Sequence, residues 1–314
     1  EGRALRAAWV IAGLALALLP VAHVRYLTST LTEVLIFALF AMSLGLLVGY
    51  AGLVSLGHAA FFGTAAYAVA LVSTRVSPAL LITLPAGVAV GTLTALAIGV
   101  FALRATGVSF LMLTLAFAQM AYAVAHQWSW LTGGTNGLSG IPRPTIPGVD
   151  FGGAVPFYYL VLLVVGAAAL VLQRIVASPF GAALIGVREN EPRMRAMGFD
   201  TFRLKLAAFV LAGATAALSG VLYAYYNGFV SPDELYWTRS GEVLVMVLLG
   251  GAGTLIGPAV GAGVVLILQN LVSSVTERWT MILGAAFILV VLVAPRGLAG
   301  LLSWRWARSS SPNA

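Results

Sequence analysis

Long apolar runs, separated by short polar turns, dominate the chain. They cover residues 7–24, 31–48, 58–73, 79–103, 107–125, 157–173, 206–226, 243–274 and 281–294. Most of these runs reach the roughly 20 residues that a helix needs to cross the hydrocarbon core of a membrane. They are continuous rather than alternating, which favours helices over the strands of a barrel. The pattern predicts an all-α integral membrane protein, with residues 1–314 forming a single polytopic domain.

Basic residues next to the runs predict how the chain crosses the membrane, because cytoplasmic segments carry an excess of arginine and lysine. If run 243–274 crossed once, the arginines that follow the last run would lie outside. Two short crossings, split near 250–258, place them in the cytoplasm. The resulting prediction has about ten spanning helices, some broken or short, with both termini cytoplasmic. The first run is expected to be a retained helix rather than a signal peptide. Residues 127–156 form an external loop in this prediction, and residues 177–205 form a cytoplasmic segment.

That cytoplasmic segment is the most polar part of the chain. It reads Arg188-Glu189-Asn190-Glu191, then Pro192, and later Ala196-Met197-Gly198. Proline is favoured in the first turn of a helix, and glycine can end a helix in a left-handed turn. We therefore expect a surface helix of one to two turns that docks on another protein, with Glu189 and Glu191 capping or pairing locally. The alternative is a solvated loop that only sets orientation.

Two glycine-rich segments interrupt the apolar pattern, and both contain Gly-x-Ala-Gly. The positions that we single out are Gly49, Gly52, Ser55, Gly57 and His58 in the first segment and Gly250, Gly251, Gly253, Gly257 and Pro258 in the second. Broken helices point to a transport pathway, because unwound backbone in a membrane must line a cavity or be covered by protein. Bulk added at Gly253 or Gly257 is then expected to clash. The alternative is that the glycines only let helices pack closely. For His58, a hydrogen bond to nearby backbone is the default expectation.

Composition and charge narrow the function. With 61% hydrophobic and 9% charged residues, and a mean hydropathy of +1.00, the chain is not a soluble globule. The net charge of +7 belongs to residues that flank apolar runs, which indicates orientation in lipid rather than nucleic-acid binding. The absence of cysteine excludes disulfides and thiolate metal sites. The glycines at 181 and 186 are followed by Val187 and Arg188, so no phosphate-binding loop is present. We expect no catalysis and no cofactor on this chain.

Together, the motifs resemble a known family. Residues 49–63, Arg188-Glu189-Asn190-Glu191 with Ala196-Met197-Gly198, and residues 249–258 are similar to the permease subunits of bacterial branched-chain amino acid ABC importers. The resemblance runs from about residue 31 to residue 297. It implies a multi-pass protein of the bacterial inner membrane that works with a second, related permease, two cytoplasmic ATPases that bind ATP and Mg, and a periplasmic binding protein. It also places residues 188–198 where the family has its ATPase-coupling helix.

The resemblance implies transport of leucine, isoleucine and valine. Urea and short-chain amide importers have closely similar permeases, so these substrates stay open. A self-contained secondary carrier or channel is a rival, and a membrane scaffold without transport is another. In the leading interpretation, apolar side chains such as Phe61, Phe62 and Leu111 line the pathway.

Overall fold

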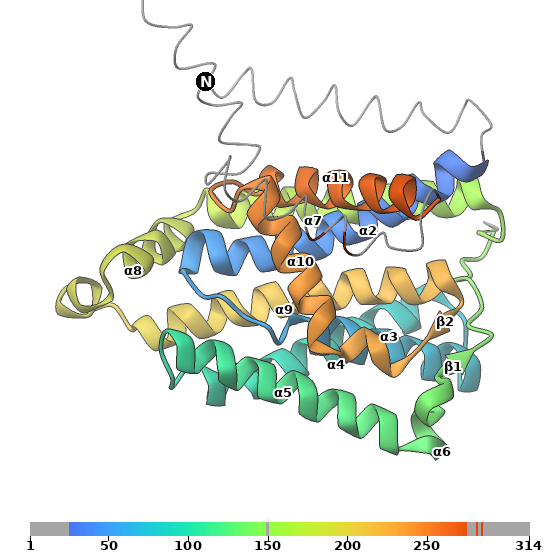
Figure 1. Cartoon of the computed structure of the whole chain (residues 1–314), viewed down its shortest axis with the longest axis horizontal. Coiled ribbons are helices and arrows are strands. Elements are labelled where there is room, and N and C mark those ends of the chain that lie inside the picture. The colour runs from blue at the N-terminus through green and yellow to red at the C-terminus, as the bar shows by residue number, and fades with distance from the viewer. Residues whose placement is uncertain (1–24, 149–150, 275–280, 282–283, 285–314) are drawn as a thin grey trace, which may run out of the picture.

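The structure is a computed structural model that describes residues 25–148, 151–274, 281 and 284 (Figure 1). The predicted first span, nearly all of the predicted last span and both termini lie outside these residues. The described helices include α2 (Arg25–Leu46), α3 (His58–Arg75), α4 (Leu80–Ala102), α5 (Val108–Gln127), α6 (Ser129–Thr132), α7 (Ala154–Val176), α8 (Pro179–Ala196), α9 (Thr201–Asn227), α10 (Trp237–Gly250) and α11 (Ile256–Ser273). The predicted helical fold is therefore confirmed for this part of the chain, apart from two short strands.

Six segments in the described part are long and apolar enough to cross a membrane. They are Leu27–Ala51, Leu80–Ala102, Val108–Gln127, Ala154–Val176, Thr201–Asn227 and Ile256–Ser273. The broken run at 243–274 forms two helices, α10 and α11, so the predicted break near 250–258 is confirmed. That each of the two crosses the membrane stays a prediction. The total of ten spans and the cytoplasmic position of the termini stay predictions.

The centre of the bundle consists of α2, α3, α4 and α9, with α9 packed against the other three. Small residues let these helices approach closely. A Cβ atom added at Gly91 of α4 would lie 2.4 Å from the Cβ of Ala217 in α9, and one at Gly213 of α9 would lie 2.2 Å from the Cβ of Ala95. Close backbone approach through small residues is the usual way in which helices associate in a membrane.

The segment between α5 and α7 is ordered by contacts with distant parts of the chain. It contains α6, the 3₁₀ turn η3 (Gly134–Asn136) and strand β1 (Leu138–Ser139), which pairs antiparallel with β2 (Phe229–Val230). Arg143 donates hydrogen bonds to the carbonyls of Gly152 and Gly153 at 3.0 and 2.8 Å. Beyond β2, the short helix η4 (Pro232–Leu235) leads into α10.

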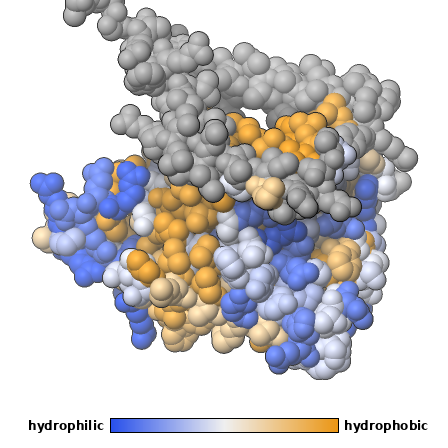
Figure 2. All heavy atoms as spheres, in the orientation of Figure 1, coloured by the Kyte–Doolittle hydropathy of each residue, from blue (hydrophilic) through white to orange (hydrophobic). Residues whose placement is uncertain are grey.

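The two predicted polar regions lie at opposite ends of the molecule. Figure 1 shows α6, β1 and β2 at one end of the bundle and α8 at the other. Figure 2 shows hydrophilic residues gathered over α8, next to an apolar surface that covers the adjoining part of the bundle. This separation is what a protein needs if its apolar middle lies in lipid and its two ends lie in water.

Candidate coupling site

Helix α8 consists of two helices joined at Asn190. The backbone of Asn190 is not helical (φ −156°, ψ 88°), and its side-chain Oδ1 accepts a hydrogen bond from the backbone N–H of Arg193 at 3.0 Å. Asn190 is thus the N-cap of a short second helix whose first residues are Glu191 and Pro192. The predicted helix start at Pro192 is confirmed. The helix that precedes it, from Pro179, was not anticipated.

The short helix ends in the predicted left-handed turn. Gly198 has φ +87°, its N–H bonds to the carbonyl of Arg195 at 2.9 Å, and the N–H of Phe199 bonds to the carbonyl of Met194 at 3.1 Å. These two bonds form a Schellman motif, which satisfies carbonyls at the helix end. Met194 is buried and lies against Gly186, so the second helix folds back on the first.

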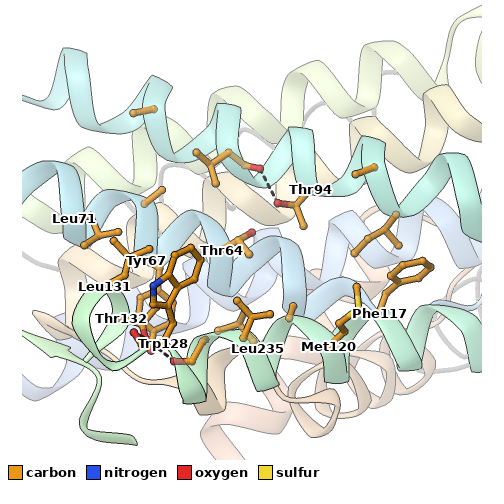
Figure 3. Close-up of a pocket in the computed structure, with 18 of the residues that line it drawn as sticks. Thr64, Tyr67, Leu71, Thr94, Phe117, Met120, Trp128, Leu131, Thr132 and Leu235 are labelled. Atoms are coloured by element: carbon orange, nitrogen blue, oxygen red, sulfur yellow. Dashed lines mark hydrogen bonds between the residues drawn. The ribbon is translucent and has the colours of Figure 1, made fainter. Parts of the chain in front are cut away.

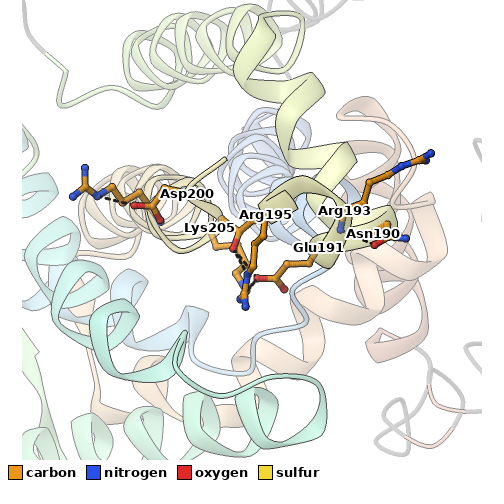
Figure 4. Close-up of polar contacts among 8 residues, drawn as sticks. Asn190, Glu191, Arg193, Arg195, Asp200 and Lys205 are labelled. Carbon is orange, nitrogen blue, oxygen red and sulfur yellow. Dashed lines mark hydrogen bonds and ion pairs between the residues drawn. The ribbon is translucent and has the colours of Figure 1, made fainter. Parts of the chain in front are cut away.

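Glu191 fixes the short helix to the start of α9 (Figure 4). Its Oε1 accepts hydrogen bonds from Arg195 at 2.7 Å, from the Thr201 hydroxyl at 2.9 Å and from Lys205 at 2.8 Å. The side chain of Lys205 is only 7% exposed, so its ammonium depends on this carboxylate. The expectation that Glu191 pairs locally is confirmed.

The pKa of the Glu191 carboxyl reflects these bonds. Partial burial alone would raise this pKa, but the hydrogen bonds from Lys205, Thr201 and Arg195 and the charge of Lys205 outweigh burial and hold it below 4.5. The carboxylate is therefore ionised at neutral pH and binds the short helix to α9.

Arg188, in the first part of α8, contacts the first glycine segment. Its guanidinium donates to the main-chain carbonyl of Gly49, and its side-chain stem runs past Gly52. Gly49 lies in the π-helical turn η2 (Leu47–Ala51) that extends α2, and Gly52, with φ +68°, ends this turn. π-helical turns are rare and often mark functional sites. The polar segment and the helix break are thus in direct contact.

The two glycine segments also meet each other. A Cβ added at Gly49 would lie 1.9 Å from the carbonyl oxygen of Ala252, and one at Gly45 would lie 2.6 Å from Cγ of Pro258. No side chain fits in such gaps. Both segments and Arg188 therefore form one contiguous site.

Side chains cover the unwound backbone between η2 and α3. The N–H of Leu56 donates to Thr114 of α5 at 3.2 Å, that of Gly57 donates to Ser55 at 3.1 Å, and that of Ala59 donates to Ser240 of α10 at 2.8 Å. Each bond gives a backbone N–H group a hydrogen-bond acceptor, which lipid acyl chains cannot provide. Ser55, singled out from the sequence, is fully buried and serves this backbone.

The second break lies between α10 and α11. Gly251 has φ +98°, and the N–H of Gly257 donates to the Thr254 hydroxyl at 3.0 Å. A Cβ at Gly250 would lie 1.8 Å from the carbonyl oxygen of Gly257, and one at Gly257 would lie 2.3 Å from that of Gly251. The expected clash at Gly253 is wrong for the described residues, because a Cβ there meets none of their atoms within 4 Å. Its backbone φ also lies outside the left-handed range.

His58 does not make the expected hydrogen bond to nearby backbone in the part of the chain that the structure describes. The ring is fully buried, yet neither nitrogen has a hydrogen-bond partner in the part of the chain that the structure describes. Aromatic rings surround it, with the Phe61 centroid at 5.3 Å and the Phe40 and Phe209 centroids at 6.5 Å. The ring therefore packs as an aromatic side chain at the start of α3.

The expectation for Phe61 and Phe62 is wrong in this conformation, because both are fully buried in the core rather than lining an open path. Phe62 stacks on Phe40 at 4.5 Å, and Phe61 packs edge to face against Phe209 at 5.4 Å. Aromatic pairs at these separations stabilise a core. Leu111 is only partly buried, on α5.

Sequence reasoning missed Lys205 and Thr201 as partners of Glu191, and Ser240 and Thr114 as caps of the first break. Lys205 offered a signal, because it is the only lysine in the chain and follows a segment of mixed charge. The two hydroxyl residues offered none, since a serine or threonine within a helix usually bonds to its own backbone.

The fold and this site define a multi-pass helical membrane protein in which a polar surface helix contacts one helix break, and that break packs against a second. This is the arrangement expected of a transport permease. The chain belongs to the family described as branched-chain amino acid transport system / permease component, whose family model matches residues 26–292. The resemblance inferred from the motifs is confirmed.

Two relatives are the high-affinity branched-chain amino acid transport system permease proteins LivM of Salmonella typhimurium and Escherichia coli. Each is 30% identical over 290 residues, which cover 85% of this chain and 68% of the relative. A shorter match joins the chain to the autoinducer 2 import system permease protein LsrC of Klebsiella pneumoniae, 32% identical over 142 residues, which cover 42% of this chain and 38% of the relative. No solved structure gives a significant match.

Proposed function

We propose that the chain is the membrane-spanning permease subunit of an ABC importer that moves branched-chain amino acids across the bacterial inner membrane, using ATP hydrolysed by partner subunits. One observation carries this proposal: Arg188, in the polar helix at one end of the bundle, binds the backbone of the helix break at Gly49. This hydrogen bond therefore transmits a movement of α8 directly to the backbone of the break after α2.

The exposed part of the polar segment suits docking. Glu189, Asn190, Ala196, Met197 and Gly198 are all exposed, while Met194 and Glu191 hold the short helix in place from behind. A rigid helix with a free outer face is a suitable ligand for a groove on a partner protein. We assign residues 188–198 as the segment that docks into a cytoplasmic ATPase.

Two routes lead from this helix into the membrane. One passes from Glu191 through Lys205 to α9, which is second in burial to Leu27–Ala51 among the six candidate spans. The other passes from Arg188 to η2 and on to the second break at Ala252. A short displacement of the docked helix then shifts packed elements that have discrete arrangements, which is how small movements are amplified in proteins.

The proposed assembly has a second, related permease, two ATPases that hold ATP and Mg, and a periplasmic binding protein that selects the solute, all set in lipid. The names of the LivM relatives support a branched-chain amino acid as the solute. The LsrC match shows that related permeases serve other import systems. The selectivity of the binding protein thus decides between a branched-chain amino acid, urea and a short-chain amide.

Uptake by the reconstituted system tests the proposal. The chain, its sister permease, both ATPases and the binding protein are placed in proteoliposomes, and radiolabelled leucine uptake is followed with ATP or with a non-hydrolysable analogue. ATP-dependent leucine uptake that also needs the binding protein supports the proposal. Uptake by this chain alone, without ATP, supports the secondary carrier or channel instead. Uptake of urea in place of leucine supports the other importer class.

A further inference from the structure

Leu235 and Glu234 of η4 lie in different surroundings. Leu235 lines an apolar groove of about 790 Å³ between α3, α4 and α5, as Figure 3 shows. Glu234 does not line this groove. Its side chain is only 8% exposed and belongs to a network of charged and hydroxyl groups on the other side of η4. Ionisable side chains at membrane depth are costly, and they usually serve a function.

Arg239, near the start of α10, is the centre of this network. Its Nε donates to Glu234 at 3.0 Å, its Nη1 to Glu242 at 3.0 Å and its Nη2 to the Tyr223 hydroxyl at 3.4 Å. The Tyr223 hydroxyl in turn donates to Glu234 at 2.9 Å. We call these four side chains the Arg239 network. It joins η4 and α10 to α9.

The network also reaches α2. The Arg239 guanidinium lies over the ring of Phe37, 5.8 Å from its centroid, and Phe37 packs edge to face against Tyr223 at 5.9 Å. Glu33, one turn earlier on α2, is near enough for its charge to interact with Arg239 and Glu242. Three carboxylates thus surround one guanidinium. The closed arrangement depends on Arg239, because without it these like charges would repel one another.

A buried contact between charges can exist in two states. When the charges are paired, as they are here, they satisfy one another; when they are separated, each can be hydrated as water enters. An apolar contact has no such second state, because opening it exposes hydrocarbon to water. Buried ion pairs add little stability over apolar packing, so stability alone does not account for this network. It suits a contact that breaks and forms again.

Helix α10 connects the Arg239 network to the coupling site. Arg239 lies near one end of the helix, and the other end is Gly250, at the second break, which packs against the first. Fourteen residues of α-helix extend about 21 Å. Beside Arg239, Ser240 accepts the hydrogen bond from the N–H of Ala59. A movement of the two breaks therefore reaches the network through a single helix.

We propose that the Arg239 network is the outer gate of the transport pathway. It is closed in this structure, and it opens when α10 carries Arg239 away from Tyr223. Because η4 directly follows β2, the network lies toward the β1–β2 end of the bundle, opposite α8. The inference rests on the proposed function, which requires the pathway to open on each side in turn. Arg239 is a positioning residue here, a role distinct from that of the coupling residues Arg188 and Glu191.

A single cysteine reports whether the gate is open, and the chain has no cysteine of its own. Ser219 is fully buried, one turn inward from Tyr223 on α9, and its hydroxyl bonds to a carbonyl of its own helix at 2.7 Å. The full importer is placed in proteoliposomes, and a membrane-impermeant maleimide is added on the β1 side. Ser139→Cys, exposed on β1, confirms that the reagent reaches this side. Labelling of Ser219→Cys should be at least threefold faster with enclosed ATP than with enclosed ADP.

Tyr223→Phe weakens the gate. It removes the hydroxyl that bonds to Glu234 and Arg239, while the ring remains packed against Phe37. The rate of labelling follows the population of the open state, which this loss raises. With enclosed ADP, labelling of Ser219→Cys should therefore become about fivefold faster, the effect of one hydrogen bond.

Tyr225→Phe is the matched control on the same helix. The Tyr225 hydroxyl is also buried, but it bonds to Thr83 of α4, outside the Arg239 network. Each variant loses buried hydrogen bonding, so both should lower the melting temperature. Only Tyr223→Phe should speed the labelling of Ser219→Cys. This comparison separates a gate from a contact that merely stabilises the fold.

Arg239→Met removes the whole charge and keeps an unbranched apolar side chain. With enclosed ADP, labelling of Ser219→Cys in this variant should reach the rate that the parent shows with ATP. If Arg239→Met does not fold, Tyr223→Phe decides the question. Labelling that is independent of ATP in the parent, or equal acceleration in Tyr223→Phe and Tyr225→Phe, would overturn the gate.

The outcomes separate this inference from the proposed function. If the parent importer takes up leucine while Tyr223→Phe labels at the same rate as Tyr225→Phe, only the gate assignment is overturned. If the parent importer takes up no leucine, the proposed function fails, and the gate assignment fails with it.

Discussion

The guanidinium of Arg188 donates a hydrogen bond to the carbonyl oxygen of Gly49, a residue 139 positions earlier in the chain. Gly49 in turn lies so close to Ala252 that a Cβ at this position would overlap the Ala252 carbonyl oxygen. Three segments that are far apart in sequence thus share one site: the polar helix, the break after α2 and the break after α10. In the proposed importer, a partner docked on residues 188–198 acts on the backbone of both breaks through this site.

The second break gives a prediction with an internal control. A Cβ at Gly257 would overlap the carbonyl oxygens of Gly251 and Gly250, whereas a Cβ at Gly253 meets no atom of the described residues within 4 Å. Gly257→Leu should therefore abolish transport through a local clash, and Gly253→Leu should retain at least half of the parent uptake. Both should insert in the membrane to similar levels. Equal loss in the two variants would contradict this account of the break.

Glu191→Gln tests the contact between the short helix and α9. It removes the charge that pairs with the buried Lys205, and leaving a buried cation without its partner destabilises a protein. Since Glu191 is partly exposed, we expect a loss of about 1–3 kcal/mol of stability. Arg203→Ala is the matched control, because the Arg203 side chain is 85% exposed in its pair with Asp200, and surface pairs contribute about 0–1 kcal/mol. Thermal melts in detergent compare the two.

The same carboxylate gives a pH dependence. Hydrogen bonds hold the folded-state pKa of Glu191 below 4.5. A depressed carboxyl pKa contributes stability above the unfolded-state pKa, and this stability is lost as the pH falls through the folded-state pKa. The difference in melting temperature between the parent and Glu191→Gln should therefore be constant near pH 7 and shrink below pH about 4.5. A difference that grows on acidification would contradict the assigned sign.

The exposed face of the polar helix predicts docking defects without misfolding. Gly198 has φ +87°, where a β-branched side chain is strained, so Gly198→Val should disrupt the end of the short helix. Glu189→Lys reverses a charge on the exposed face. Both variants should lower co-purification of the ATPase at least threefold, with the melting temperature of the isolated permease changed by no more than a few degrees. Arg104→Ala, an exposed position between α4 and α5 and outside residues 188–198, should co-purify normally. Normal ATPase capture by both variants would favour the solvated loop.

Much of the fold could be predicted from the sequence because apolar runs of helical length need little context. The polar helix was also predictable, since Pro192 and Gly198 have strong local preferences. The contact between the two glycine segments was not, because it depends on how α2 and α10 pack. Nor could the sequence show that Phe61 and Phe62 face the core, since a helix buried on several sides carries no amphipathic signal. Gly253 and Gly257 looked equivalent, and only their surroundings separate them.

The most direct test of the central claim is the number of leucine molecules imported per ATP hydrolysed in the reconstituted importer with Arg188→Ala. Arg188 joins α8 to the break at Gly49, and Arg188→Ala leaves other exposed residues of the docking segment unchanged: Glu189, Asn190, Ala196, Met197 and Gly198. We predict that the ATPases still co-purify and hydrolyse ATP at a rate within about twofold of the parent, while leucine uptake falls at least tenfold, which corresponds to the loss of about 1.4 kcal/mol of coupling. An unchanged ratio of leucine to ATP would contradict the claim that this contact transmits the movement.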